Sequence, residues 1–294
     1  MKKEDIAAAF QQIQDHICNQ LISEGNLKEY QEDKWERAGG GGGRTRIMQG
    51  EIIEKGGVNF SAVHGETPEK ILQALKLDKA DFFATGVSIV MHPVNPFCPI
   101  IHMNIRYFEM SNGTSWFGGG IDLTPHYINE QDANYFHNTL KQVCDKHDPN
   151  YYTKFKNWAD DYFYIKHRKE TRGIGGIFFD RLSPKEKDIE SLFSFVKEVG
   201  MSFPIIYNHL LDTNKNKEYS QKHLDWQSLR RSRYVEFNLV YDKGTKFGLD
   251  TDGRTESILM SMPPIAKWVY DYQAQKNSEE EKTLSLLKKG VNWV

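Results

Sequence analysis

Two stretches of the chain, 85–92 and 100–110, alternate apolar and other residues over a length that fits an extended β-strand. In 100–110, the period of two places an apolar set of side chains on one face of the strand. The other face carries His102, Asn104 and Arg106 together with Phe108. Strands with one apolar and one mixed face are typical of an antiparallel sheet on which helices pack.

The rest of the chain supplies helices on both sides of these strands in the sequence. Helices are predicted over 6–21, 130–147, 150–164 and 217–231, and capping boxes at Ser183 and Ser278 predict two further helix starts. The β-α-β alternation of a doubly wound parallel sheet is absent, and no linker rich in Pro, Gly or Ser divides the chain. We therefore predict an α+β fold with a single domain over residues 1–294 and a mainly antiparallel sheet.

Further strands are predicted around tight turns. Gln49-Gly50 joins 44–48 to 51–54 as a hairpin, a third strand covers 58–63, an apolar strand covers 174–179, and Asp242-Lys243-Gly244 joins 234–241 to 245–249 as a second hairpin. The strand after this hairpin is expected to end at Pro263-Pro264. Five consecutive glycines, 39–43, predict a loop, because no regular element favours such a run.

The charge balance limits the classes of partner. With 38 Lys and Arg against 40 Asp and Glu, the net charge is −2, whereas binding to duplex DNA by bulk charge needs many basic groups on one face. We therefore expect no nucleic-acid partner, despite the basic tetrad 230–233. Mean hydropathy is −0.63, and no apolar run approaches the length of a membrane helix, so no integral membrane segment is expected.

The cysteines and the first residues indicate the compartment. Cys18, Cys98 and Cys144 are widely separated and form no C-x-x-C pair, which argues against a thiolate zinc site, an iron–sulfur cluster or a disulfide framework. The acidic start, Glu4-Asp5, lacks the apolar segment of a secretory signal. We expect a cytoplasmic protein.

Polar residues at alternate positions of 100–110 form the main candidate site. Arg106 can hold a carboxylate, Asn104 can hydrogen-bond, and His102 titrates near neutral pH as an acid or base. Ser88 and His92 share one face of the preceding strand. We expect these side chains to converge on one surface.

Two glycine-rich stretches indicate places where a ligand approaches the backbone. The run 39–43, followed by Arg44 and Arg46, exposes amide N–H groups and guanidinium groups to an anion, or is a flexible surface loop. The run 118–120, followed by Asp122, suits a flat ligand, or forms a β-bulge with a turn aspartate.

Motifs from about residue 30 to the C-terminus resemble the oxygen-dependent coproporphyrinogen III oxidases. The matching stretches are 38–44, 57–61, 86–88, 92–96, 102–108, 116–125, 156–158, 167–176, 244–249 and 256–261. Three positions depart from the family pattern. Ser115 replaces a tryptophan, and Ser232 and Asp252 stand where the family has glycines.

This resemblance implies a fold and a reaction. The family has a flat seven-stranded antiparallel sheet between helices, in a homodimer whose interface corresponds to about 234–268. The reaction is oxidative decarboxylation of the ring A and B propionates of coproporphyrinogen III to vinyl groups, with O2 as co-substrate. It gives protoporphyrinogen IX in haem biosynthesis. No flavin, haem or iron–sulfur cluster is expected, and a divalent metal cation is left open.

The resemblance also assigns roles to residues. The family's metal histidines correspond to His92, His102, His137 and His167, although their spacings match no compact metal motif. Its proton donor corresponds to His102, and its catalytic pair to Arg106 and Asp122. Its substrate contacts correspond to Ser88, Asn104, Ile105, Arg106, Asp252, Gly253 and Arg254.

The substrate's chemistry sharpens these expectations. Four propionates carry about four negative charges at neutral pH, because carboxyl pKa values are near 4. The expected arginines are Arg44, Arg46, Arg106 and Arg254. Asp122 is expected to accept a hydrogen bond from a pyrrole N–H and activate the ring toward oxygen. Two alternatives stay open: a porphyrin carrier that consumes no oxygen, and a metal-dependent hydrolase or oxygenase built on the four histidines.

Overall fold

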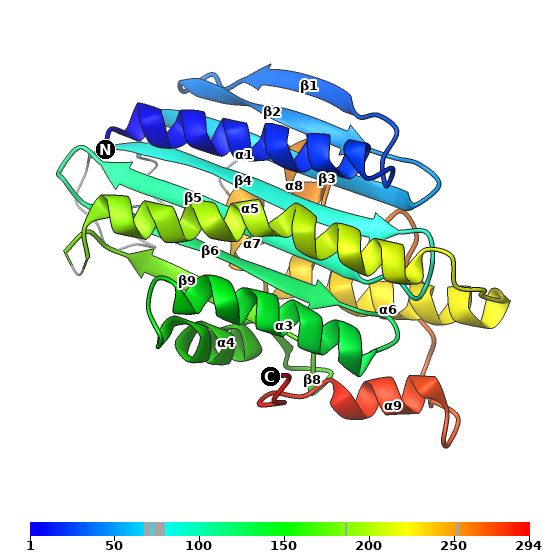
Figure 1. The fold of residues 1–294 in the computed structure, drawn as a ribbon. Helices are drawn as coiled ribbons and strands as arrows, with labels where there is room; N and C mark the ends of the chain where they lie inside the picture. The colour runs from blue at the N-terminus through cyan, green and yellow to red at the C-terminus, as the bar shows by residue number, and fades with distance from the viewer. Residues whose placement is uncertain (68–71, 73–79, 186, 251–252) are drawn as a thin grey trace.

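A computed structural model of the chain contains one seven-stranded antiparallel sheet with helices on both of its faces (Figure 1). The structure describes every residue except 68–71, 73–79, 186 and 251–252. Each strand pairs antiparallel with its neighbours in the order β1-β2-β3-β4-β5-β6-β9. The predicted α+β fold with a seven-stranded antiparallel sheet is confirmed.

The first six strands of the sheet are neighbours in sequence order, and the last joins after two helices. They are β1 (Gln31–Glu36), β2 (Gly41–Met48), β3 (Ile53–Glu66), β4 (Asp81–Pro93), β5 (Ile100–Met110), β6 (Ser115–Thr124) and β9 (Gly176–Leu182). Two short strands, β7 (Tyr164–Ile165) and β8 (Glu170–Thr171), pair separately. The predicted strand 58–63 is the second half of the long strand β3.

Helices divide between the two faces of the sheet (Figure 1). One face is covered by α1 (Lys3–Ser23), α3 (Glu130–Asp145) and α5 (Ile189–Asn214), with α4 (Tyr151–Tyr162) beside β9. The opposite face carries α6 (Gln221–Val240), α7 (Lys243–Asp250) and α8 (Thr255–Leu259), and α9 (Glu279–Leu286) lies near the C-terminus. The helix predicted from Ser278 is confirmed, and the Ser278 hydroxyl accepts from the Glu281 N–H at 3.1 Å. The Glu281 carboxylate accepts from the Asn277 N–H rather than from Ser278, so only the N-cap half of the predicted capping box is formed.

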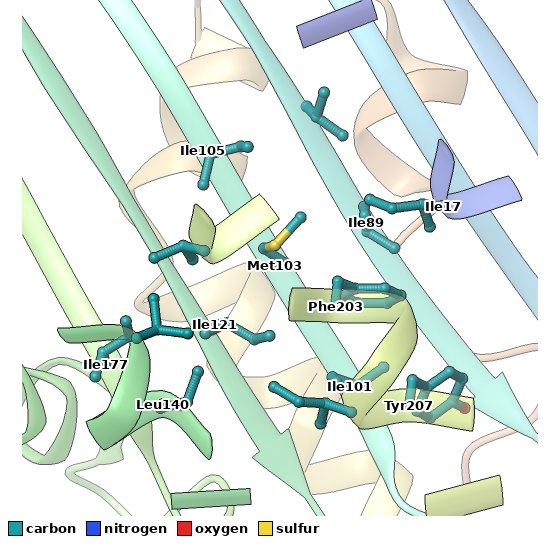
Figure 2. Packing of buried hydrophobic residues seen from close by; sticks show 14 of the residues in the cluster. Ile17, Ile89, Ile101, Met103, Ile105, Ile121, Leu140, Ile177, Phe203 and Tyr207 are labelled. Atoms are coloured by element: carbon teal, nitrogen blue, oxygen red, sulfur yellow. The ribbon is translucent and has the colours of Figure 1, made fainter. Parts of the chain in front are cut away.

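The main hydrophobic core lies between the sheet and the layer of α1, α3 and α5 (Figure 2). Alternate residues of β5, Ile101, Met103 and Ile105, are fully buried there with Phe203 of α5. Burial of each such side chain contributes about 1.5–3 kcal/mol. Because a strand turns successive side chains to opposite faces, the polar set of β5 faces α6, α7 and α8 instead.

The hairpin predicted over 234–249 and the strand predicted before Pro263 are wrong, because these residues form α6, α7 and α8. The alternation also permits a helix. Tyr234, Phe237 and Asn238 are buried at spacings of three and four, which is the helical period. Leu239 and Val240, which a strand would have placed on opposite faces, are both exposed, at 46% and 49%.

The glycine run is only partly a loop. Gly41–Gly43 belong to β2 and pair with β1 and β3, so only Gly39 and Gly40 form the turn. A Cβ atom added at Gly43 would lie 2.3 Å from Cζ2 of Trp35. The strand therefore needs a glycine where the tryptophan of the neighbouring strand crosses it.

Two helix boundaries also differ from the prediction. The helix expected from Ser183 begins at Ile189, where the Asp188 side chain accepts from the Ser191 N–H at 2.8 Å. The sheet strand β9 continues to Leu182. The helix expected over 217–231 is α6, which continues to Val240.

The basic tetrad of α6 faces the interior of the protein. Its three arginines are buried and each pairs with a carboxylate: Arg230 with Glu170, Arg231 with Glu54, and Arg233 with Glu236. The pairs of Arg230 and Arg231 join α6 to β8 and β3, whereas Arg233 pairs within α6. Among the described residues, none of the helices has the length and apolar character required to cross a membrane.

Candidate active site

The sheet face on the side of α6, α7 and α8 presents a floor of small and polar residues. Two neighbouring rows cross strands β3 to β6: Asn59, Ser88, Asn104 and Gly120 in one, and Ser61, Gly86, Arg106 and Gly118 in the other. Three strand spacings of about 4.8 Å make each row about 14 Å wide. The predicted convergence of Ser88, Asn104 and Arg106 on one surface is confirmed, and we call these two rows the floor.

Arg106 is the cation on the floor, and two side chains position it. Its Nη2 pairs with Oδ1 of Asp180 at 2.9 Å, and its Nη1 donates to Oδ1 of Asn104 at 3.0 Å. The arginine side chain is 40% exposed. The guanidinium is thus oriented by the protein while it stays accessible to an anionic ligand.

The pair of Arg106 and Asp180 explains why one of the glycines is needed. A Cβ atom at Gly118 would lie 2.4 Å from Oδ1 of Asp180 and 3.0 Å from Nε of Arg106. Asp180 was not among the residues predicted from the sequence. The pattern that could have identified it is the period of two in β9, which places Asp180 on the same face as Phe178.

Aromatic rings border the floor on two sides. Phe108 and Trp116 stack at 4.5 Å beside the row of Arg106, and Tyr162 and Phe178 stack at 4.1 Å on the side of β9. Phe178 lies opposite Gly120 in the register. A surface of small residues bordered by aromatic rings, with an oriented cation, suits an anionic ligand that carries unsaturated rings.

His102 borders the floor in the next row, where it contacts Asp122. The histidine Nδ1 lies 2.8 Å from Oδ1 of Asp122, and Arg172 Nη2 donates to both carboxylate oxygens at 2.7 and 2.8 Å. Burial alone would raise the pKa of Asp122, but the Arg172 charge and the His102 hydrogen bond hold it below its usual value. Asp122 is therefore an ionised group in the interior.

The contacts of Asp122 differ from those predicted from the sequence. Its side chain is 1% exposed, and both oxygens are engaged by Arg172 and His102. The structure leaves no free oxygen for the predicted hydrogen bond from a pyrrole N–H. His102, with a side chain that is 21% exposed, is the accessible member of the pair.

The family of the chain is decided by its full-length match. Residues 5–293 match the family model described as Coproporphyrinogen III oxidase. The chain belongs to this family.

Individual relatives agree with the family match along nearly the whole chain. The chain is 47% identical to Coproporphyrinogen-III oxidase 1, chloroplastic, of Arabidopsis thaliana, over 96% of this chain and 76% of that protein. It is 48% identical to the oxygen-dependent coproporphyrinogen-III oxidase of Drosophila melanogaster, with the same coverage. It is also 48% identical to the oxygen-dependent coproporphyrinogen-III oxidase of Francisella tularensis, over 94% of both chains.

Two of the arginines expected to bind the coproporphyrinogen propionates lie on the face of the sheet opposite to Arg106. Arg44 and Arg46 point toward α1, where both pair with Asp15, at 2.7 and 2.6 Å. The expectation that they bind the same ligand as Arg106 is wrong, because alternate residues of β2 face opposite sides. Their position follows from the register of β2 with β3, which the sequence did not reveal.

The other residues matched to the oxidase family divide into three groups. Arg254 lies on the same face as the floor and pairs with Asp33 of β1, next to Gly253. Ile105 is fully buried in the core on the opposite face, so only its backbone is available to the floor. Asp252 lies outside the described residues.

The family's four metal histidines do not converge within one chain. His92 is buried with Nε2 2.9 Å from the Ser261 carbonyl oxygen, and His137 lies on α3 between Tyr152 Oη and the Ile174 carbonyl, both at 3.0 Å. His167 lies 2.7 Å from both Glu236 and Tyr241. Burial lowers the pKa of His92 and of His137 to about 3.

These partners decide whether the histidines fit a metal. Of the residues that the structure describes, no three His, Cys, Asp or Glu side chains form a group that could hold a metal ion. His102, the fourth histidine, is engaged by Asp122. The predicted set of ligands therefore does not fit one metal site in this chain.

Proposed function

We propose that this chain is an oxygen-dependent coproporphyrinogen III oxidase, which converts the ring A and B propionates to vinyl groups and yields protoporphyrinogen IX for haem biosynthesis. The observation that carries the proposal is the floor, where an oriented arginine lies on a glycine-rich surface bordered by aromatic rings. The names of the relatives supply the substrate and the use of oxygen.

The electron balance defines what the site must do. Loss of CO2 from one propionate also removes a hydride equivalent, which is two electrons and one proton, and leaves a vinyl group. Two such steps release four electrons, and these reduce one O2 to two waters with four protons. The protein must therefore hold a carboxylate, admit oxygen and move protons.

The floor residues divide these tasks. The guanidinium of Arg106 binds the carboxylate of the reacting propionate until CO2 leaves, in place of part of its pairing with Asp180. The glycine at 118 leaves room for the pair of Arg106 and Asp180 that holds the guanidinium in place. His102 exchanges a proton with the bound substrate, because it is an accessible titratable group beside the floor. Ser88 and Asn104 supply hydrogen bonds in the neighbouring row.

An oxygen-controlled assay tests the proposed function. Purified chain is incubated with coproporphyrinogen III in aerated and in anaerobic buffer, and product porphyrin fluorescence and CO2 release are followed. We expect turnover in the aerated sample only. Binding without product in both samples would instead support a porphyrin carrier.

A chelator titration of the same assay tests the metal. Because the four histidines each have other partners, we expect full turnover after removal of divalent cations, with no metal retained in stoichiometric amount. Activity that disappears with chelator and returns with one added divalent metal would contradict this expectation. It would support a metal-dependent enzyme that completes its site in another way.

We also propose a homodimer formed through the segment 234–268. Support comes from large apolar side chains that are exposed on and around this segment: Leu239, Val240, Leu249, Ile265, Trp268, Val269 and Tyr270. Monomeric proteins seldom expose apolar groups so densely, and such patches mark interfaces. A second copy of this chain is the proposed occupant.

The dimer is tested with two variants, each of which introduces one negative charge on a different side of the sheet. Val240→Glu is expected to convert a dimer of 34.1 kDa chains to monomers, measured by sedimentation or light scattering. Ile205→Glu is the control, because Ile205 is also exposed but lies on α5, across the sheet. A monomeric wild type, or loss of the dimer in both variants, would contradict the assignment of this surface.

A cytoplasmic location is the remaining part of the proposal. It is supported by the three cysteines, which are all buried and free, as is usual in a reducing compartment. Burial raises the pKa of Cys18 to about 11 and of Cys98 and Cys144 to about 12, so these thiols are unreactive.

A further inference from the structure

Strand β9 contains a β-bulge at Asp180 and Arg181. Its register with β6 shifts there, so that these two residues lie opposite a single residue of β6, Gly118. In a regular strand, successive side chains point to opposite faces, and only one of the two would reach the floor. The bulge brings both to this side of the sheet. Asp180 pairs with Arg106, and the guanidinium of Arg181 lies over the ring of Trp116.

The backbone of Arg181 has a conformation that arginine seldom adopts. Its φ is 53°, in the left-handed region, where a residue with a Cβ atom is strained. Glycine adopts the same conformation without this strain. Strained residues of this kind are concentrated at functional sites. The bulge therefore holds an arginine where the backbone alone would favour glycine, and we looked for what its side chain can bind.

The guanidinium of Arg181 lies at the border of the floor and is open to a ligand. Its central carbon is 5.7 Å from the centroid of the Trp116 ring, which stacks on Phe108 at 4.5 Å. These two rings lie one row beyond Arg106 in the register of β5 and β6, and such rows are about 7 Å apart. Arg181 is exposed, and no ion pair joins it to another described residue.

The two arginines already placed on this face each have a carboxylate partner. Arg106 pairs with Asp180, and Arg254 pairs with Asp33, so part of the charge of each is balanced within the protein. A substrate with about four negative charges needs further positive charge beside the floor. Arg181 supplies a charge that no described carboxylate balances.

We propose that Arg181 binds the carboxylate of a second propionate of the macrocycle, while Arg106 holds the propionate that reacts. This inference rests on the proposed function, and it names the group that orients the non-reacting side of the substrate. Two cations in neighbouring rows fix the direction of the macrocycle on the floor, which one cation cannot do. The contact with Arg181 is the same in the bound substrate and in the transition state, so it contributes to binding and not to the chemical step.

Arg181→Gly separates this role from a structural one. The substitution removes the cation and also relieves the backbone strain, so we expect a free energy of unfolding in urea that is equal to that of the wild type or higher. We expect KM for coproporphyrinogen III to rise about 10-fold, as for the loss of one contact to a charged group, with kcat within about twofold of the wild type. Arg181→Lys keeps the charge and is expected to give an intermediate KM.

Lys169→Gly is the matched control. Lys169 is also basic, exposed and left-handed, with a φ of 58°, but it lies in the turn between β7 and β8, outside the seven-stranded sheet. The control removes one positive charge and relieves the same kind of strain. We expect it to keep KM close to the wild-type value. An equal rise of KM in both variants would mean that total charge, and not the position of Arg181, is responsible, and would overturn the inference.

Binding of coproporphyrin III, the oxidised form of the substrate with the same four carboxylates, gives a readout that needs no turnover. Measured by the quenching of tryptophan fluorescence, its Kd is expected to rise about 10-fold in Arg181→Gly and to stay unchanged in Lys169→Gly. An unchanged Kd and KM in Arg181→Gly would contradict the proposal, and so would a loss of stability that accompanies the weaker binding. Failure of the proposed function appears separately, as a wild type that binds coproporphyrin III through Arg181 and gives no turnover of coproporphyrinogen III.

Discussion

Arg106→Ala is expected to lower kcat/KM for coproporphyrinogen III by about 100-fold. A hydrogen-bonded contact to a charged group contributes up to about 3 kcal/mol, and each 1.4 kcal/mol corresponds to a factor of ten. The substitution also removes the partner of Asp180, whose carboxylate then repels the propionate that should bind there. Steady-state kinetics at several substrate concentrations would measure the loss and divide it between kcat and KM.

Two further arginine variants show whether position or charge alone is responsible. Arg106→Lys keeps the charge but loses the paired N–H donors, so we expect an intermediate loss. Arg44→Ala removes an arginine on the opposite face, where it pairs with Asp15, and is expected to keep kcat/KM close to wild type. If Arg44→Ala lost activity as strongly as Arg106→Ala, the placement of the site on one face would be wrong.

This contrast shows what the sequence could and could not predict about the site. The period of two in 100–110 was sufficient to place His102, Asn104 and Arg106 on one face. The same rule applied to Arg44 and Arg46, but nothing in the sequence stated which face of their strand meets α1. That depends on which face of β3, the strand with which β2 pairs, packs against the helix layer, and this is a tertiary contact.

Other parts of the site were missed because they depend on tertiary contacts. Asp180 and Arg172 join the candidate site only through the partners that the fold brings to them, across 74 residues to Arg106 and 50 residues to Asp122. The error over 234–249 has a different origin. Apolar residues in this segment recur both at a spacing of two residues and at spacings of three to four residues. The packing of Tyr234 and Phe237 selects the helix. Local pattern alone cannot choose between two periods that both fit.

Glu54→Gln is expected to destabilise the fold by about 3 kcal/mol, although Glu54 is the more exposed member of its ion pair. Its partner, Arg231 of α6, is 2% exposed and the Glu54 side chain is 31% exposed, with 2.6 Å between Nη2 and Oε2. Burial lowers the pKa of Arg231, which Glu54 partly opposes. Loss of the carboxylate leaves a buried, uncompensated charge, and this costs about 3–5 kcal/mol for fully buried pairs.

Replacement of the arginine of this pair is expected to lower the free energy of unfolding much less than replacement of Glu54. In Arg231→Met, Glu54 can turn toward water, and the Pro93 carbonyl that Arg231 also binds at 2.9 Å keeps a hydrogen bond from Gln227 at 3.2 Å. We expect a loss of about 1 kcal/mol, because the carboxylate left behind is 31% exposed and can be solvated, so no fully buried charge remains unpaired. The double variant should be more stable than Glu54→Gln alone, since it removes the unpaired charge.

Urea unfolding of the three variants and of Glu51→Gln would measure these differences. Glu51 forms an exposed pair with Lys28 at 3.1 Å, and loss of such a pair is expected to change stability by less than about 1 kcal/mol. Equal losses for Glu54→Gln and Arg231→Met would mean that the pair contributes through its mutual attraction. A larger loss for Glu54→Gln would mean that burial of the arginines in the basic tetrad has a desolvation cost, which the paired carboxylates offset. It would also mean that buried charges hold α6 over the floor.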